Sequence, residues 1–258
     1  MQNNFKIIFF GTPDFAMPVL EALTKNGYNV SRFQPQSLRD ERVFEEFKSL
    51  QPDLCIVAAY GKILPARYLE IPKYGFLNVH PSLLPKYRGP SPVQTAILNG
   101  DTETGASIMI VDQEIDHGPV LASAPYQIPD SKQNTEIVEE IFRLGAQLLI
   151  DILPKYLNKE IKPVEQDHSQ ATFTKMFSRE DGRINWSESG DKIYNRIRAL
   201  NPEPGTWTKW NGKIINIKKA ELCDGKINIK TIQMEGKKDM SFEEFLRGQP
   251  GFDISQLK

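Results

Sequence analysis

The stretch FKIIFFGTPDFAMPVLEALTKNG, residues 5–27, decides the fold class. Its first six residues are a nearly continuous apolar run, which is typical of a strand buried on both faces. Apolar residues then recur at helical spacing from Phe15 to Leu23, and Asn26-Gly27 predicts the end of that helix. A strand, a turn and a helix in this order predict an open α/β sheet.

Strands and helices continue to alternate through the first part of the chain. Short apolar runs predict buried strands, and longer runs with helical periodicity predict helices that cover the sheet. The predicted fold is therefore α/β, with an open, mostly parallel twisted sheet flanked by helices, over residues 1–157. The predicted helices span residues 39–51, 91–100 and 134–157, and the predicted strands span residues 54–60, 75–79 and 106–112.

The composition changes after residue 157. Residues 158–180 are polar and predict a linker. A helix over residues 189–200 and strands that alternate around Asn211-Gly212, a strong hairpin signal, predict a second domain over residues 181–258. We expect its strands to form a small OB-like β-barrel, closed or incomplete.

Composition and charge limit the class of protein. Hydrophobic residues make up 40% and charged residues 25% of the 258 residues, as in an ordinary globular protein. The formal net charge of −1 provides no overall basic field, so any contact with nucleic acid has to come from a local patch. Cys55 and Cys223 are far apart in sequence, and no apolar segment is long enough to span a membrane. These features predict a cytoplasmic protein with no membrane contact, and we expect a monomer.

Two polar residues stand at the end of the predicted strand in LNVHPSLLPKYRG, residues 77–89. Asn78 and His80 are two residues apart, so on a strand both side chains point to the same side. In open α/β sheets, ligands bind at the carboxyl ends of the strands. An Asn amide can donate to a developing oxyanion, and a His can relay protons near neutral pH. The spacing alone fits a catalytic pair and a pair of hydrogen-bonded strand-end groups equally well.

Asp116 follows another predicted strand, in the segment VDQEIDHGPV. By the same argument its carboxylate would lie at the edge of the sheet, where it could orient His80 and favour its charged form. The alternative interpretation is a turn residue, since Asp is common in turns. His117 and His168 are interpreted as surface or loop histidines.

The segment PSLLPKYRGPSP, residues 81–92, contains four prolines, and such a loop loses little entropy when it becomes ordered. Leu83 and Leu84 could line a pocket for a flat ring, and Lys86 and Arg88 could meet a carboxylate or a phosphate. The alternative is a rigid connector with ordinary surface charges. Three histidines without clustered Cys/His spacing predict no metal site.

Several motifs, taken together, are similar to those of one family. The sequence resembles the methionyl-tRNA formyltransferase family across nearly its whole length. The N-terminal motifs alone also fit the wider class that uses 10-formyltetrahydrofolate, and the C-terminal motifs indicate the tRNA-acting family. The motifs are GTPDFA (11–16), VAAYGKILP (57–65), LNVHPSLLPKYRGPSPVQTAILNGD (77–101), TGASIMIVDQEIDHGPV (104–120), REDGRINWS (179–187), IRALNPEPGTW (197–207) and EGKKDMSFEEFLRG (235–248).

The resemblance implies an activity and a set of site residues. It implies transfer of the formyl group of 10-formyltetrahydrofolate to the α-amino group of methionyl initiator tRNA, with tetrahydrofolate as product and no metal. It implies a Rossmann-like formyltransferase domain followed by a tRNA-binding domain. Asn78, His80 and Asp116 match the family's catalytic residues. The folate-binding residues are matched by Ser82, Leu83, Leu84 and Pro85, with Lys62, Ile63, Leu64, Gln113, Glu114 and Ile115 as further backbone contacts. Lys86, Arg88, Lys213, Lys218, Lys219, Lys237 and Lys238 are the expected tRNA contacts.

The chemistry that the family implies agrees with the residue types. The methionyl amine attacks as a neutral nucleophile, and an α-amino pKa of about 7.7 to 8.0 leaves a usable neutral fraction near neutral pH. Asn78 and a protonated His80 would then stabilise the negative oxygen that forms, while Asp116 keeps His80 charged and assists proton movement. An amino-sugar nucleotide N-formyltransferase would share these three residues, and a catalytically silent tRNA- or folate-binding module is the second alternative.

The sequence departs from the family at two short segments. At Val30-Ser31 it lacks a second strand and a long basic loop, and at Gly225-Lys226 it lacks part of the small β-domain. Either the enzyme is a compact variant, or mobile segments are omitted from the sequence and their ordered ends are joined. The first gap is expected to remove one sheet strand and one tRNA contact. Because of the second gap, the sequence does not decide whether a five-stranded barrel closes.

We predict that the missing loop weakens formylation of tRNA, because a basic loop supplies phosphate contacts. The test compares this chain with a version that carries a basic loop between Val30 and Ser31. Equal rates on charged initiator tRNA would contradict the prediction.

Overall fold

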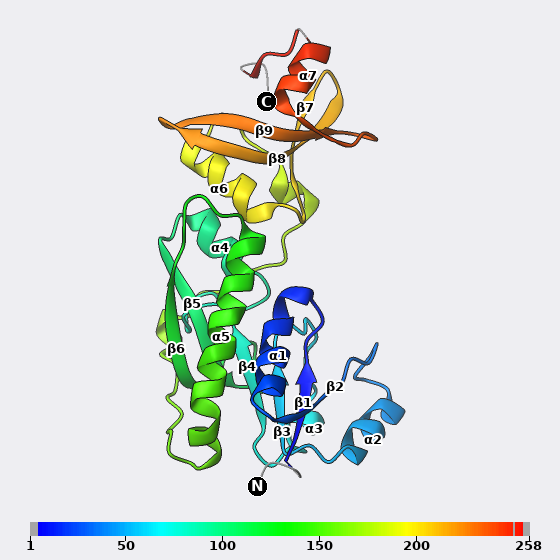
Figure 1. Cartoon of the computed structure of the whole chain (residues 1–258), viewed down its shortest axis with the longest axis vertical. Helices are drawn as coiled ribbons and strands as arrows, with labels where there is room; N and C mark the ends of the chain where they lie inside the picture. The colour runs from blue at the N-terminus through cyan, green and yellow to red at the C-terminus, as the bar shows by residue number, and fades with distance from the viewer. Residues whose placement is uncertain (1–4, 250, 255–258) are drawn as a thin grey trace. The chain divides into compact units, whose positions relative to one another are not determined.

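The computed structural model of this chain describes residues 5–249 and 251–254, and these form two units (Figure 1). The first unit comprises the described residues up to Pro92, together with Glu103–Gln127 and Val138–Thr174. The second unit comprises Val93–Thr102, Ile128–Ile137 and the described residues from Lys175 onward.

The first unit is built on a six-stranded sheet with strand order β2-β1-β3-β4-β5-β6. The first four strands in this order are parallel, whereas β5 is antiparallel to β4 and β6 is antiparallel to β5. The predicted open, mostly parallel sheet is therefore confirmed. The strands are β1 (Lys6–Phe10), β2 (Asn29–Arg32), β3 (Leu54–Val57), β4 (Phe76–His80), β5 (Glu103–Ile110) and β6 (Val120–Gln127).

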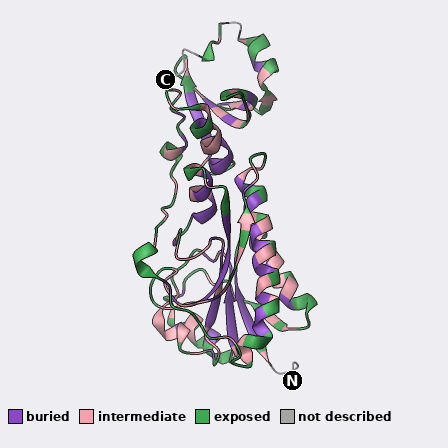
Figure 2. Cartoon of the chain, turned by 90° about the vertical axis from the view of Figure 1, so that its left-hand side faces the viewer, coloured by how far each residue is buried: buried purple, intermediate pink, exposed green. Residues whose placement is uncertain are grey.

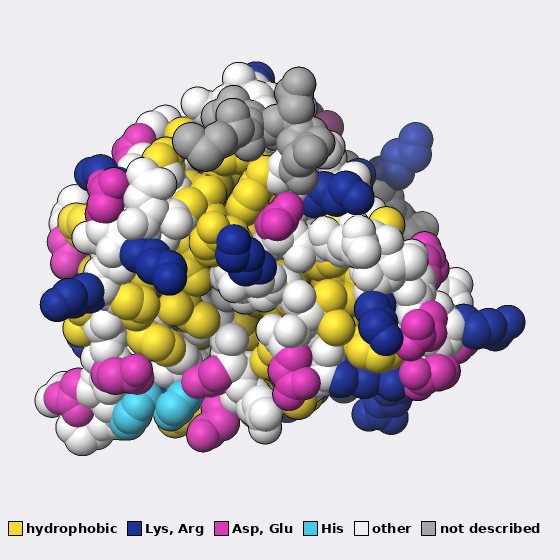
Figure 3. All heavy atoms as spheres, turned by 90° about the horizontal axis from the view of Figure 1, so that it is seen from below, with side chains coloured by type: hydrophobic (Ala, Val, Ile, Leu, Met, Phe, Trp, Pro, Cys, Tyr) yellow, Lys and Arg dark blue, Asp and Glu magenta, His cyan; other side chains and the backbone are white. Residues whose placement is uncertain are grey.

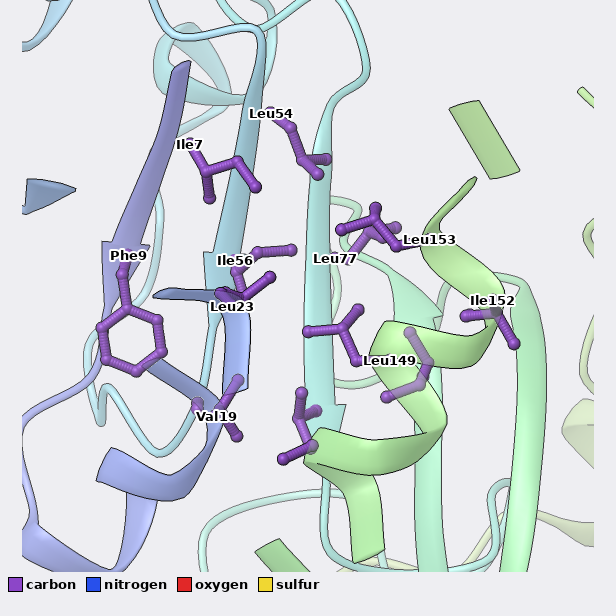
Figure 4. Close-up of a cluster of buried hydrophobic side chains, with 14 of the residues drawn as sticks. Ile7, Phe9, Val19, Leu23, Leu54, Ile56, Leu77, Leu149, Ile152 and Leu153 are labelled. Carbon is purple, nitrogen blue, oxygen red and sulfur yellow. The ribbon is translucent and has the colours of Figure 1, made fainter. Parts of the chain in front are cut away.

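Helices cover both faces of this sheet, which explains why its central strands are apolar throughout. On one face, α1 (Met17–Lys25) and α5 (Asn134–Leu157) contribute to a core that contains Ile7, Leu23 and Leu149, among the residues drawn in Figure 4. On the other face, Phe47 of α2 (Glu41–Ser49) and Tyr68 of α3 (Ala66–Leu69) pack against alternate strand residues. The central strands are buried along their length in Figure 2.

Strand β4 shows how this packing positions the candidate site. Leu77 and Val79 belong to the core under α1 and α5, whereas Phe76 belongs to the core on the opposite face. Because side chains alternate along a strand, Asn78 and His80 point to the same face as Phe76. The predicted common direction of these two polar groups is confirmed.

Two edge strands differ from the predictions. Asn29–Arg32 forms β2 and pairs in parallel with β1 from Lys6↔Asn29 to Phe9↔Arg32, so the predicted loss of a sheet strand at Val30-Ser31 is wrong. Backbone pairing with the free edge of β1 is sufficient for these largely exposed residues. Strand β6 was not predicted, because only Leu121 is buried in the run VLASAPYQ and the run contains Pro125.

The second unit contains an antiparallel four-stranded sheet with strand order β10-β9-β8-β7. Helix α6 (Gly190–Leu200) packs against this sheet through Ile193 and Ile197, which share a hydrophobic core with Ile215, Ile217 and Ile232. The described strands form an open sheet and not a closed five-stranded barrel. Its strands are β7 (Thr206–Trp210), β8 (Lys213–Cys223), β9 (Lys226–Met234) and β10 (Asp239–Ser241), and the helices that complete the chain are α4 (Pro92–Asn99), α6 (Gly190–Leu200) and α7 (Phe242–Gly248). Short 3₁₀ turns occupy Asp14–Ala16, His168–Gln170 and Arg179–Gly182.

Two tight turns connect the long strands of this sheet. The predicted hairpin is confirmed, because Asn211 and Gly212 have φ values of 48° and 75° and join β7 to β8. Asp224 and Gly225, with φ values of 50° and 72°, join β8 to β9 in the same way. Positive φ at both central residues is what a two-residue hairpin turn of type I′ requires. The shortened segment at Gly225-Lys226 is therefore a well-formed turn.

None of the helices found among residues 5–249 and 251–254 has the length and apolar character needed to cross a membrane.

The turn at Gly212 yields a stability prediction. A Cβ added there would meet no atom within 4 Å, so the cost of Gly212→Ala comes only from the left-handed backbone at φ 75°. We expect the free energy of unfolding of the second unit to fall by about 1–2 kcal/mol, the cost of that conformation for an L-residue. Urea unfolding followed by tryptophan fluorescence measures it, because Trp186, Trp207 and Trp210 all lie in this unit.

Gly248→Ala is the matched control. Its added Cβ also meets nothing within 4 Å, and Gly248 lies in α7 without a positive φ, where Ala is preferred to Gly. A Gly212→Ala protein as stable as the unaltered chain would contradict the turn assignment.

Candidate active site

The candidate site begins at the carboxyl end of β4. His80 is the last residue of the strand and is 3% exposed, whereas Asn78 is partly exposed. Asn78 can therefore contact a ligand directly, and His80 lies beneath the surface.

Asp116 joins this pair by a different route from the one predicted. Strand β5 runs antiparallel to β4, with Leu77 opposite Ile110 and His80 opposite Ser107, so the carboxyl ends of these two strands lie at opposite ends of the pair. The strand-end argument is therefore wrong for Asp116. The loop after β5 instead turns back toward β4, and Asp116 itself has a positive φ of 48°.

The carboxylate of Asp116 is the meeting point of three groups. Its Oδ1 accepts a hydrogen bond from Asn78 Nδ2 at 3.2 Å and lies 3.6 Å from His80 Nδ1. Its Oδ2 accepts a hydrogen bond from the backbone N–H of Gly89 at 2.7 Å. The three predicted catalytic residues thus converge, and the Gly89 N–H is a further partner that the sequence did not indicate.

The orientation of the His80 ring follows from its second nitrogen. His80 Nε2 lies 2.9 Å from the carbonyl oxygen of Tyr87. A carbonyl oxygen only accepts hydrogen bonds, so Nε2 must carry a proton. His80 Nδ1 is 3.6 Å from Asp116, which is too long for a hydrogen bond but short enough for charge attraction.

The proline-rich loop after β4 is fixed by buried hydroxyl groups. Ser107 of β5 is fully buried, and its Oγ donates to Ser82 O at 2.8 Å and accepts from Leu84 N at 3.1 Å. Ser82 is also buried, and its Oγ donates to Lys86 O at 2.6 Å. The Ser82 hydroxyl is therefore used within the loop, while Leu83, Leu84 and Pro85 are partly exposed. Sequence patterns gave no signal for Ser107.

Two further loops carry the remaining residues expected to contact folate. After β3, Lys62 Nζ donates to Pro35 O at 2.6 Å and to Gln36 O at 3.0 Å, and Ile63 is 78% exposed. After β5, Ile115 is 58% exposed. Leu64 is partly exposed, and Gln113 and Glu114 are exposed. Two large apolar side chains are thus open to solvent beside polar neighbours.

Tyr60 precedes the first of these loops and is buried in the core on that face of the sheet. Burial raises the pKa of its phenol to about 12, so Tyr60 remains protonated near neutral pH. Among the described residues, no cluster of three or more His, Cys, Asp and Glu side chains is placed to hold a metal ion.

Arg88 does not lie where a tRNA contact was expected. It is 3% exposed, and its guanidinium donates to Gln166 Oε1 and, at 2.8 Å, to His168 Nδ1. The assignment of Arg88 as a surface tRNA contact is therefore wrong. His168 stacks on His117 with ring centroids 4.1 Å apart, and Figure 3 shows two adjacent histidine side chains among acidic ones at the surface.

The other expected tRNA contacts are surface lysines. Lys86 is exposed on the proline-rich loop of the first unit. In the second unit, Lys213 and Lys219 of β8 are exposed and Lys218 is partly exposed. Lys237 and Lys238 are exposed between β9 and β10.

Sequence comparison identifies a family with two characteristic parts. The formyl transferase family model matches residues 16–153, and the model of the formyl transferase C-terminal domain matches residues 176–227. The chain is 43% identical over 249 residues to a methionyl-tRNA formyltransferase of Chloroflexus aurantiacus, an alignment that covers 84% of this chain and 80% of that protein. The alignment is 249 positions long but contains only 84% of the 258 residues of this chain. Some of its positions are therefore gaps in this chain, at which the relative carries residues that this chain lacks.

Solved structures share the fold. A methionyl-tRNA formyltransferase from Clostridium thermocellum has a TM-score of 0.72 and 24% identity, covering 89% of this chain and 98% of that one. HypX from Aquifex aeolicus in complex with tetrahydrofolic acid has a TM-score of 0.76 and 18% identity, covering 94% of this chain and 46% of that one. The family matches over both parts of the chain, together with the 43% identity, show that this chain belongs to the methionyl-tRNA formyltransferase family.

Proposed function

We propose that this chain transfers the formyl group of 10-formyltetrahydrofolate to the α-amino group of methionyl initiator tRNA. The proposal rests mainly on one observation: Asn78 and His80 converge on the carboxylate of Asp116 in a member of this family. The expectations of a monomer and of a cytoplasmic location belong to this proposal and stay predictions.

The loops near the site fit a folate. Ile63 and Ile115 are large apolar side chains that are 78% and 58% exposed, and a flat ring packed on them would remove that surface from water. Leu83, Leu84 and Pro85 present a further partly apolar surface on a loop whose backbone is fixed by Ser82 and Ser107. Backbone groups at residues 62–64 and 113–115 would supply polar contacts to the pteridine.

The amine nitrogen would add to the formyl carbon of the bound folate, which places negative charge on the formyl oxygen. The bond from that carbon to N10 would then break, and the proton lost by the amine would end on N10 of the departing tetrahydrofolate. Asn78 uses one amide N–H on Asp116, and its second N–H is the donor for the formyl oxygen as that oxygen gains negative charge. Asp116, whose side chain is 16% exposed, accepts the amine proton directly or through a water.

In this proposal, His80 is buried behind Asp116 and stabilises its carboxylate. Its side chain is 4% exposed and its Nε2–H is held by Tyr87 O, so it acts beside Asp116 and not at the surface. A proton on Nδ1 would attract the carboxylate across the 3.6 Å that separates them.

The second unit is proposed to bind tRNA. Lys213, Lys218, Lys219, Lys237 and Lys238 lie within it and supply a local source of positive charge on a chain whose net charge is −1. The proposed tRNA-binding domain covers residues 181–258, with Lys86 as the contact from the first domain, residues 1–157, and residues 158–180 between them.

Direct assay separates this function from its alternatives. We expect the chain to incorporate labelled formyl from 10-formyltetrahydrofolate into methionyl initiator tRNA. Formylation only of an amino-sugar nucleotide would show the sugar-acting alternative instead. Folate or tRNA binding without formylation of either substrate would show a silent module.

Removal of the Asn78 amide tests its proposed role as an oxyanion donor. We expect Asn78→Ala to lower kcat about 10²- to 10³-fold, the usual effect of losing one such donor. The matched control is Asn158→Ala, because Asn158 is exposed and its amide contacts only Glu160 in the bonds found for it. Steady-state kinetics with charged tRNA, alongside thermal unfolding of both variants, give the comparison. An Asn78→Ala enzyme with the kcat of the control would disprove the role.

A further inference from the structure

We propose that Gln166 is a positioning residue for formyl transfer, holding both the Asp116 loop and the proline-rich loop in place through one side-chain amide. Gln166 lies in the segment that the sequence predicts to be a linker, yet it is 7% exposed. This inference rests on the proposed function, because it concerns the same site.

The amide N–H groups of Gln166 fix the backbone around Asp116. Gln166 Nε2 donates to Asp116 O at 2.9 Å and to Gly118 O at 2.7 Å. Asp116 has a positive φ of 48°, a conformation that needs support from its surroundings. The backbone at Gly118 is also closely enclosed, because a Cβ added there would lie 2.1 Å from Ile110 O. The direction of the Asp116 carboxylate therefore depends on this amide.

The carbonyl oxygen of the same amide holds the proline-rich loop. Gln166 Oε1 accepts from Arg88 Nε at 3.2 Å and from Arg88 Nη2 at 2.8 Å. Arg88 lies between Tyr87, whose carbonyl accepts from His80, and Gly89, whose N–H donates to Asp116. Both N–H groups and the oxygen of the Gln166 amide are thus used, and they link the two segments that contact His80 and Asp116.

The residues that follow Gln166 reinforce the attachment. Arg88 N donates to Thr172 O at 2.8 Å, and Thr174 N donates back to Arg88 O at 2.8 Å. Tyr87 N donates to Thr172 Oγ1 at 2.8 Å. Residues 172–174 therefore run alongside the proline-rich loop and are part of the site's support.

Gln166→Glu separates the contact with Arg88 from the contacts with the backbone around Asp116. A glutamate keeps an acceptor for Arg88 but loses both N–H donors and sets a carboxylate oxygen against the carbonyls of Asp116 and Gly118. We expect kcat to fall about 10- to 100-fold, because a small misplacement of a catalytic group has effects of this size, with both KM values nearly unchanged. Gln170→Glu is the matched control, since Gln170 is exposed and receives the same change of charge. It should keep the kcat of the unaltered enzyme.

Gln166→Met provides a second variant of similar length without a charge, and it should show the same loss of kcat per folded molecule. If either folded Gln166 variant keeps kcat within about twofold of the control, the inference fails. If the unaltered chain does not formylate methionyl-tRNA, the proposed function fails instead.

A double-mutant cycle distinguishes positioning from general support of the fold. In a protein that carries Asp116→Asn, Gln166→Glu should cost little further activity, because its effect passes through the Asp116 carboxylate. Single-turnover reactions with enzyme in excess keep the slow variants measurable. An equal loss in the two backgrounds would show a merely structural role and overturn the inference.

Discussion

The candidate site depends on one shared acceptor, the carboxylate of Asp116. It joins the amide of Asn78, the ring of His80 and the backbone N–H of Gly89, which come from a strand end and from the loop that follows it. A carboxylate is well suited to this task, because its two oxygens accept several hydrogen bonds and charge-assisted bonds are the stronger ones. Without it, Asn78 and His80 would still point to the same side of β4 and Tyr87 O would still hold the His80 ring, but the Asn78 amide would lose the hydrogen bond that orients it.

The sheet supplies the rigidity that this arrangement needs. Cores on both faces hold β4, with Leu77 and Val79 packed on one face and Phe76 on the other. The two polar side chains are therefore carried by a strand that cannot rotate or slip without moving its apolar neighbours to the wrong side. Ser107 in β5 then fixes the adjacent loop, so that loop geometry is set by the sheet as well.

Local patterns in the sequence were sufficient to predict part of the sheet and part of the candidate site. Continuous apolar runs predicted β1, β3 and β4, and the two-residue spacing predicted the shared direction of Asn78 and His80. The strands β2 and β6 were missed because edge strands need backbone pairing more than apolar side chains. The hydrogen bonds of Gln166 and Ser107 could not be predicted either, because their partners lie many residues away and a single polar residue carries no periodic signal. Arg88 was misassigned because sequence does not show whether a cation is buried.

The tautomer of His80 tests this account most directly. Long-range ¹⁵N–¹H NMR of the imidazole rings near neutral pH, with His80 assigned from a His80→Gln variant, reports which nitrogen carries a proton. The account predicts a protonated Nε2 that donates to Tyr87 O, with Nδ1 facing Asp116. A His80 ring whose Nε2 is unprotonated would contradict it.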